Sequence, residues 1–579
     1  MAARDPRAAV YAFHDQSKHH VNRFARSSGY LDWATQPNPF RSFDGAPRID
    51  LVAPFRTATS GHSPGSSLRF RSAQADPGID CAYDDLFVAP RAPRLLPGPA
   101  ALSVFFRYSL GLSAWKQAGG SRWALRVNPS SGNLHPTEGY AVVSPAVVDD
   151  RPGVYHYAPD AHALEQRCVF SADAWDSVMR ELPTGAFLAG LTSIHWREAW
   201  KYGERAFRYC QHDVGHAIAA MRMAAALMGW RLRVLPNCSH AVLAAVLGTD
   251  RGGDFGEAEP EEPACLCLVW SGPDQRRDPD DVARLGSAIA AGEWTGRANQ
   301  LSASRVPWDA IDAVAEASRA PGGACRATAA VPEVSPVVRS TIVAVSSAAG
   351  LLLQRRSAVA MDGESTLARN RFLFMLRRLL PGDRVPWDAL WWEPRVHLVL
   401  FVHRVDGLEP GIYAFARTPG ALTAMQQRLR SDFAWLRPTG VDADLPLYLL
   451  APLDVRRVSR RLSCGQDIAA DGFFSLGMMA DFDAALAEHG PSFYRQLFWE
   501  AGAIGQMLYL EAEAAGARGT GIGCFFDDAV HEVLGITDHQ FQSLYHFTVG
   551  MPVDDPRLQT HPGYPWDSSV GLSRRRECR

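Results

Sequence analysis

A long internal repeat constrains the fold of this chain more strongly than any other feature of its sequence. Glycines recur at one constant offset in residue number, here called the repeat offset, in the pairs Gly215 and Gly502, Gly229 and Gly516, and Gly248 and Gly535. A leucine precedes the last glycine of each set, and GVYHY (153–157) resembles GIYAF (411–415) if a gap is allowed between these segments and the glycines. A period this long predicts a duplicated domain rather than a solenoid of short repeats.

Both copies of the repeat mix helical and strand patterns. In residues 96–275, EGYAVV and ACLCLVW are typical of strands, and residues 204–230 carry the broad apolar stripe of a long helix. In residues 336–566, VHLVLFVHRV predicts a strand, while LARNRFLFMLRRLL and FYRQLFWEAGAIGQMLYLEAEAAG predict helices. We therefore predict an α+β chain with one domain in each part, here called region one (96–275) and region two (336–566).

Three flanking segments complete the predicted organisation. Residues 1–95 are rich in Pro, Gly and Ser and are typical of a loop-rich arm. Its many aromatic and basic residues suggest that it covers a pocket or holds a substrate, although no spacing decides between the two. Residues 276–335 are expected to form a linker with short helices, and residues 567–579 a basic tail.

Composition excludes several classes of protein. The 59 basic and 62 acidic residues leave a net charge of -3, which disfavours a nucleic-acid binder. The longest apolar runs fall short of the roughly 18 residues that a membrane span needs, and the N-terminus lacks the apolar stretch of an export signal. We therefore expect a cytoplasmic protein without a membrane partner. None of the ten cysteines forms a C-x-x-C pair, so neither a zinc framework nor a disulfide scaffold is expected.

Four short segments could carry chemistry, and each also has an ordinary structural explanation. NPSSGN (128–133) could offer donors to a flat polar ring or a phosphate, or be a plain turn. QRRSA (354–358) could bind phosphate through two guanidinium groups, or complement a helix dipole. GTGIG (519–523) fails the dinucleotide-loop spacing but would allow a ligand to approach the backbone closely.

The fourth segment contains one of only three lysines in the chain, the others being Lys18 and Lys116. Lys201 and its neighbour Tyr202 could transfer protons in a partly buried site, or form an exposed helix turn. His212 and His216 share a helix face, but no third ligand has suitable spacing, so a structural pair is favoured over a metal site. GHSPG (61–65) has the letters of a nucleophile elbow without the strand-turn-helix context, and we reject it.

Taken together, NPSSGN, QRRSA, KYGERAFRYCQHDVGH and LYLEAEAAGARGTGIGCFFDD resemble the flavin-dependent nitroreductase superfamily. The resemblance is narrower to its SagB/ThcOx-type dehydrogenases, which include the azoline oxidases, and it covers regions one and two. It implies two domains, each an antiparallel sheet flanked by helices, fused into a pseudo-dimer with FMN between them. The arginines of QRRSA would bind the FMN phosphate and GTGIG would run along the ring.

The resemblance also implies specific residues. The loop under the flavin would contribute Pro129, Ser130, Ser131 and Asn133; the phosphate and ring segments would contribute Arg355, Arg356, Ser357, Gly521, Ile522 and Gly523. Region one has only RYS (107–109) where an arginine segment should lie, and region two has PWDALWWEPRVHLVL in place of the loop. We therefore expect one intact FMN site and one decayed site.

The implied activity is dehydrogenation of a peptide-derived or heterocyclic, azoline-like substrate in a biosynthetic pathway. Lys201 or Tyr202 would remove a proton while a hydride passes to the flavin, with oxygen or another acceptor reoxidising it, and a biosynthetic partner enzyme is possible. Two alternatives stay open. One is an NAD(P)H-dependent reductase of nitro or quinone compounds, and the other is a flavin-free scaffold subunit that kept the fold.

Overall fold

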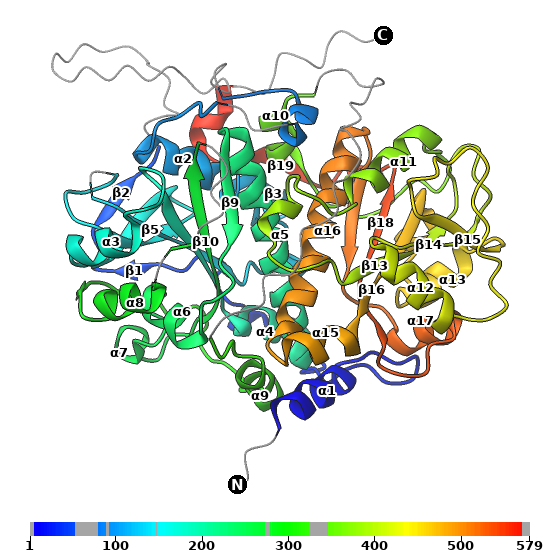
Figure 1. Cartoon of the computed structure of the whole chain (residues 1–579), viewed down its shortest axis with the longest axis horizontal. Coiled ribbons are helices and arrows are strands. Elements are labelled where there is room, and N and C mark those ends of the chain that lie inside the picture. The colour runs from blue at the N-terminus through cyan, green and yellow to red at the C-terminus, as the bar shows by residue number, and fades with distance from the viewer. Residues whose placement is uncertain are drawn as a thin grey trace.

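Two antiparallel sheets lie on either side of two long helices, α5 (Ala206–Leu227) and α16 (Phe493–Ala514), which pack side by side (Figure 1). The computed structural model describes residues 5–52, 79–88, 92–145, 147–272, 278–279, 281–322 and 346–569. In this part of the chain no helix is long and apolar enough to cross a membrane.

The two sheets share one strand order. The first sheet runs β7-β6-β5-β8-β10-β9, and the second runs β15-β14-β13-β16-β18-β17 in the corresponding positions. The first sheet also contains β11 and β2, which both pair with β7. The first sheet contains β2 (Arg48–Asp50), β5 (Thr137–Val143), β6 (Gly153–Ala158), β7 (Ala163–Val169), β8 (Phe187–Ser193), β9 (Trp230–Val234), β10 (Glu262–Ser271) and β11 (Glu293–Trp294). The second contains β13 (Val396–Val402), β14 (Gly411–Phe415), β15 (Leu447–Pro452), β16 (Phe474–Asp481), β17 (Arg518–Ile522) and β18 (Phe541–Gly550). The three predicted strands correspond to β5, β10 and β13.

Successive side chains of each strand point to opposite faces of the sheet, and this divides the core into layers. On β8, Phe187, Ala189 and Leu191 face the central helices, whereas Leu188 packs against the outer helices of region one. Those outer helices are α3 (Ala172–Met179), α6 (His240–Leu247) and α8 (Val282–Ala290). In region two the outer layer is formed by α12 (Pro419–Arg428), α13 (Arg456–Leu462) and α17 (Asp527–Leu534). The central layer is thus shared by both regions, as expected of a fused pseudo-dimer.

The repeat in the sequence is a repeat in the structure. The helices α4 (His195–Tyr202) and α6 have counterparts in α15 (Phe482–His489) and α17, which begin and end one repeat offset later. Gly215 and Gly502 lie where α5 and α16 cross, because a Cβ atom on either would collide with a carbonyl oxygen of the other helix. The prediction of a duplicated α+β domain is confirmed.

The segments around the two sheets contain more regular structure than their composition suggests. The arm begins with a helix, α1 (Pro6–Gln16), which the sequence reading did not predict, and α1 packs against α9 (Asp309–Ala317). The arm also contributes β1 (Phe43–Asp44), which pairs with β12 (Arg297–Ala298), and the turns η1 (Trp33–Thr35) and η3 (Tyr83–Phe87). The rejected GHSPG segment and residues 570–579 lie outside the described part of the chain.

Further elements connect the two regions. A small sheet orders β19-β3-β4, with β3 (Leu112–Ala118), β4 (Ser121–Arg126) and β19 (Gln559–Pro562), and so joins the C-terminal segment to region one. The remaining elements are α2 (Pro99–Arg107), η4 (Ser131–Asn133), η5 (Gly203–Arg205), α7 (Gly252–Phe255), α10 (Ala348–Gln354), α11 (Arg369–Arg378), η6 (Trp387–Ala389), α14 (Ile468–Asp471) and η7 (Pro565–Ser569).

Candidate functional site

A cavity of about 690 Å³ lies between the two regions, and both supply its walls. Region one contributes the loop between β4 and β5, which contains η4. Region two contributes the residues after α10 and the strand β17. The cavity brings together Pro129, Ser130, Ser131, Asn133, Tyr202, Arg355, Arg356, Ser357, Gly521, Ile522 and Gly523. Of the predicted site residues, only Lys201 is not part of the lining.

Within the NPSSGN loop, several polar side chains hold the loop itself. The Ser130 hydroxyl accepts a hydrogen bond from the backbone N–H of His135 at 2.8 Å, and the Asn133 amide donates to the carbonyl of Ala124 at 2.7 Å. Ser131 donates its backbone N–H to the carboxylate of Asp213 on α5 at 3.3 Å. The loop is therefore anchored to β4 and to the long helix.

The loop rests on the Lys201-Tyr202 pair at the end of α4. Gly132 has a φ of 57°, and a Cβ atom there would lie 2.5 Å from the Tyr202 hydroxyl and 3.2 Å from the Lys201 amine. Only glycine permits this approach without moving the phenol. The structure therefore places both side chains against Gly132 of the loop, at the C-terminal end of α4, and Tyr202 also lines the cavity. Burial raises the pKa of Tyr202 well above its ordinary value, so its phenol keeps the proton at neutral pH.

The other end of the cavity is basic. Arg355 donates to the carbonyls of Val127 and Arg126 at 3.0 and 3.1 Å and so joins region two to region one. Burial, and after it the charge of Arg355, lowers the pKa of Arg356 to about 9. Burial, Arg356 and Arg518 likewise lower the pKa of Lys116. Cations that repel one another in a partly buried pocket are stabilised by an anion such as phosphate.

Tyrosines line the cavity beside β17. The Tyr509 hydroxyl accepts the backbone N–H of Gly521 at 3.0 Å and lies 2.9 Å from the Ser357 hydroxyl. A side chain on Gly521 would collide with the hydroxyl of Tyr545. Gly521 is thus required by the tyrosine packed against the strand, in addition to any approach of a ligand.

Two buried carboxyl groups lie beneath the loop and were missed by the sequence reading. Glu198 and Asp213 are 0% and 2% exposed. Burial raises the pKa of Asp213 to about 7, while burial and then the charge of Asp213 raise that of Glu198 well above its ordinary value. The pair can therefore hold a proton near Lys201 and Tyr202. Both acids stand among other polar residues of their helices, so the sequence did not distinguish them.

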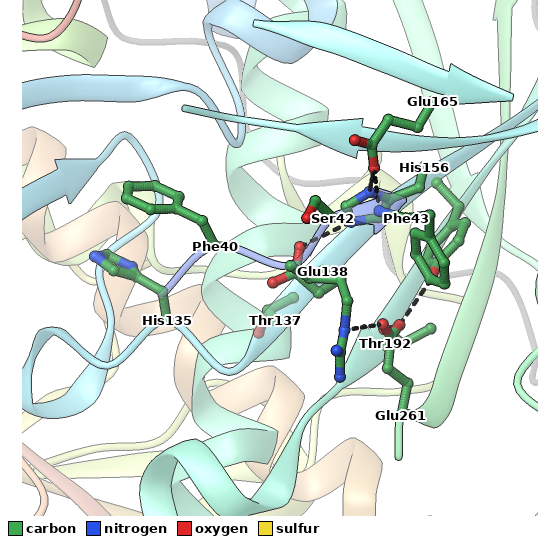
Figure 2. A network of polar contacts seen from close by, with 12 residues as sticks. Phe40, Ser42, Phe43, His135, Thr137, Glu138, His156, Glu165, Thr192 and Glu261 are labelled. Carbon is green, nitrogen blue, oxygen red and sulfur yellow. Dashed lines mark hydrogen bonds and ion pairs between the residues drawn. The ribbon is translucent and has the colours of Figure 1, made fainter. Parts of the chain in front are cut away.

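A buried charge network supports the loop from behind (Figure 2). Glu138 and Glu165 accept hydrogen bonds from the two ring nitrogens of His156, at 3.1 and 3.0 Å. The two glutamates raise the pKa of His156 to about 9 against the opposing effect of burial. Arg197 joins Glu138 to the carbonyl of His135, the latter at 2.6 Å. The network fixes the start of β5 and hence the end of the loop.

The predicted histidine pair packs against one residue of the cavity wall. The His212 ring stacks on Tyr545 at 4.2 Å, and His216 forms a 3.2 Å hydrogen bond with the Tyr545 hydroxyl. Among the described residues, no group of three or more His, Cys, Asp or Glu side chains could hold a metal ion.

The cavity fits FMN. Its basic end offers Arg355, Arg356 and Lys116 to a phosphate. Two buried atoms along its walls, Asn128 Oδ1 and His135 Nδ1, have no hydrogen-bond partner in the described structure. A bound polar ring system could supply these missing partners. Sequence reasoning missed Lys116 and the two tyrosines of region two, because only the packing of distant segments brings them here. It singled out the NPSSGN loop without assigning a role to Asn128 or to His135, which follows the loop.

The fold and this cavity define a nitroreductase-like fold built from two fused halves. The chain superposes with a TM-score of 0.65 on a candidate nitroreductase from Anabaena variabilis, at 21% identity over 94% of this chain and 99% of that one. Residues 443–551 match the model of the nitroreductase family. It is also 30% identical over 130 residues to the trifolitoxin-processing protein TfxB of Rhizobium leguminosarum bv. trifolii; that match spans 21% of this chain and 35% of the relative.

Proposed function

We propose that the chain is an FMN-dependent oxidoreductase of SagB/ThcOx type that dehydrogenates a peptide-derived or azoline-like heterocyclic substrate. The observation that carries the proposal is the cavity itself, where the loop of region one meets the arginines and the glycine strand of region two. A site assembled from both halves of a fused dimer is what the resemblance in the sequence implies. The relative that processes trifolitoxin supports a role in modifying a peptide product.

Each set of residues has a distinct task in this proposal. Arg355, Arg356 and Ser357 bind the phosphate, and the NPSSGN loop supports the ring. Bound FMN supplies a two-electron acceptor. Lys201 takes the substrate C–H proton, and Tyr202, whose phenol stays protonated, donates a hydrogen bond that holds the substrate. Asp213 then receives the proton from Lys201, because a pKa of about 7 leaves part of its carboxyl groups ionised at neutral pH.

The test is to quantify the flavin released from the purified full-length chain and to challenge the bound flavin anaerobically. About one FMN per chain that an azoline-containing peptide reduces and NADPH does not would support the dehydrogenase. Immediate bleaching by NADPH would instead favour the nitro or quinone reductase. Colourless protein that takes up no FMN on reconstitution would leave a scaffold subunit, and about two FMN per chain would contradict the single site.

A further inference from the structure

Two cysteines of region two meet at the rim of the cavity. Cys524 follows the end of β17 and lines the cavity, whereas Cys464 lies in the turn after α13, with a left-handed φ of 53°. Both thiols are partly exposed and unoxidised, and each affects the pKa of the other. The two segments lie side by side, because the backbone N–H of Phe526 donates to the carbonyl of Leu462 at 2.8 Å. The proposed dehydrogenation assigns no role to either residue.

The N-terminal arm brings a histidine to the same sulfur. His19 is buried and hydrogen-bonded to the Cys524 thiol. Its Nδ1 atom accepts the backbone N–H of Ala25 at 2.9 Å, and burial lowers the pKa of the ring, so the imidazole is neutral. The proton must then reside on Nε2, which donates it to the sulfur of Cys524. The arm therefore supplies a fixed donor to this thiol.

The backbone on both sides of the Cys524 side chain is clamped. Arg205 donates to the carbonyl of Gly523 at 3.1 and 3.2 Å, and Gln466 donates to the carbonyl of Cys524 at 3.0 Å. Asp527 is a buried carboxylate, but Arg205 and Arg208 bind it directly, which offsets its charge toward the thiol. The remaining ionisable groups that face the sulfur, Tyr202 and Tyr209, are phenols whose pKa burial raises.

We propose that Cys464 and Cys524 form a redox-active dithiol that reacts with hydrogen peroxide and closes to a reversible disulfide. The Cys464 thiol and His19 each donate a hydrogen bond to the Cys524 sulfur, which favours its thiolate. A thiolate at a partly exposed position beside a second thiol is the arrangement of a peroxide-sensitive cysteine.

The reaction balances with peroxide as the only oxidant. The Cys524 thiolate attacks one peroxide oxygen, the O–O bond breaks, and hydroxide leaves and takes up a proton to form water. The Cys464 sulfur then attacks the oxidised sulfur of Cys524, the S–O bond breaks, and a second water leaves. Two thiols have lost two electrons and two protons, and the peroxide has been reduced to two waters. A dithiol reductant reverses the step by exchange.

Peptide mass spectrometry after differential alkylation tests this directly. The reduced full-length chain is treated with equimolar hydrogen peroxide, and a Cys464–Cys524 disulfide that dithiothreitol reopens is expected. Cys81, also partly exposed, serves as the reference thiol and should stay reduced. In the Cys464→Ser variant, dimedone should trap a sulfenic acid on Cys524. If both cysteines stay alkylatable, or Cys524 pairs with another cysteine, the proposal fails.

The donor from the arm is tested by His19→Asn. Asparagine keeps an acceptor near the position of Nδ1 for Ala25 but removes the Nε2 proton. When the rate of iodoacetamide modification of Cys524 is measured across a pH series, the midpoint of its rise should lie about one pH unit higher in this variant, because one hydrogen bond to the thiolate is lost. Equal rates in both proteins, or a wild-type Cys524 no faster than Cys81, would refute the proposal. Neither experiment needs flavin or substrate, so its failure is distinguishable from failure of the proposed function.

Discussion

The two halves of the duplicated helical frame have diverged at equivalent positions. Helix α4 of region one ends in Lys201-Tyr202 behind the open cavity, whereas its counterpart α15 in region two ends in Glu488-His489. Tyr509 of α16 lines the cavity, but its counterpart on α5 is Arg222, which binds Asp388 through two hydrogen bonds of 2.9 and 2.7 Å. Asp388 belongs to the segment that region two has in place of the NPSSGN loop, so an ion pair and buried tryptophans lie where region one has its loop.

One further pair of positions shows how the two loops diverged. Asp213 and Glu500 are separated by the repeat offset, and both bind the backbone that precedes the first strand of their sheet. Glu500 accepts the N–H groups of Arg395 and Val396 at 2.9 and 3.1 Å and pairs with Arg417. Asp213 has no such cation among the described residues, and its pKa rises to about 7. The two halves therefore share their helices and strands but differ in these loops and in the cation beside the buried acid.

The largest difference in turnover between the two halves is expected when the amine of Lys201 is removed. Lys201→Ala should lower turnover of an azoline-containing peptide by about 10²- to 10⁴-fold, the usual contribution of a proton-transfer group, with flavin still bound. Glu488→Ala, at the equivalent position of region two, should leave turnover unchanged. Both rates are measured anaerobically as the decay of flavin absorbance. Full activity of the lysine variant would show that the catalytic assignment is wrong.

The halves should also differ in their response to pH. The folded-state pKa of His156 is raised to about 9, so its stabilising contribution is complete below pH 6.5 and is lost as the pH rises through 9. The loss is about 3 kcal/mol at roughly 1.4 kcal/mol per pKa unit. In region two, burial and Arg417 lower the pKa of His397 to about 3, so its contribution is lost in the opposite direction, as the pH falls from 6.5.

Urea unfolding between pH 6.5 and 9 measures this difference. The wild type should lose about 3 kcal/mol more than His156→Gln over that interval, and His397→Gln should lose as much as the wild type. Parallel curves for wild type and His156→Gln would mean that the imidazole between Glu138 and Glu165 is not charged in the folded protein.

Some residues of the candidate site could be predicted from the sequence, and others could not. The cavity loop and the arginine segment are each a run of adjacent residues, and the combined resemblance of the four motifs singled them out. Asp213 was not singled out, because α5 is buried nearly all round and its pattern does not tell which face borders a cavity. Glu198 was not singled out either, because it stands among other charged residues on the short helix α4. Helix α1 was missed for a different reason. Its start carries Asp5 as N-cap and Pro6 in the first turn, a signal that the Pro- and Ser-rich composition of the arm obscured.

A smaller effect is expected at the phosphate end. Arg356→Ala should weaken FMN binding by about 10- to 100-fold, or roughly 1.5–3 kcal/mol for a charged hydrogen-bond donor. The matched control is Arg107→Ala, at the RYS segment of region one, where the guanidinium instead binds Asp567 at 2.8 Å. Flavin fluorescence titration of the two apoproteins should show a change in Kd for Arg356→Ala alone. Equal losses would indicate that both halves contribute to one phosphate site.

The smallest effect is expected at the glycines of the helix crossing, a feature that both halves share. Gly215→Ala and Gly502→Ala should each destabilise the chain by about 1–3 kcal/mol in urea unfolding, because the new methyl group meets rigid backbone at the helix crossing. Gly420→Ala, on α12, meets nothing within 4 Å and should cost little. Each crossing variant should also weaken FMN binding, since Asp213 lies close to Gly215 on α5 and Tyr509 lies on α16. A crossing variant that loses stability but keeps its flavin affinity would show that the cavity tolerates a shift between the helices.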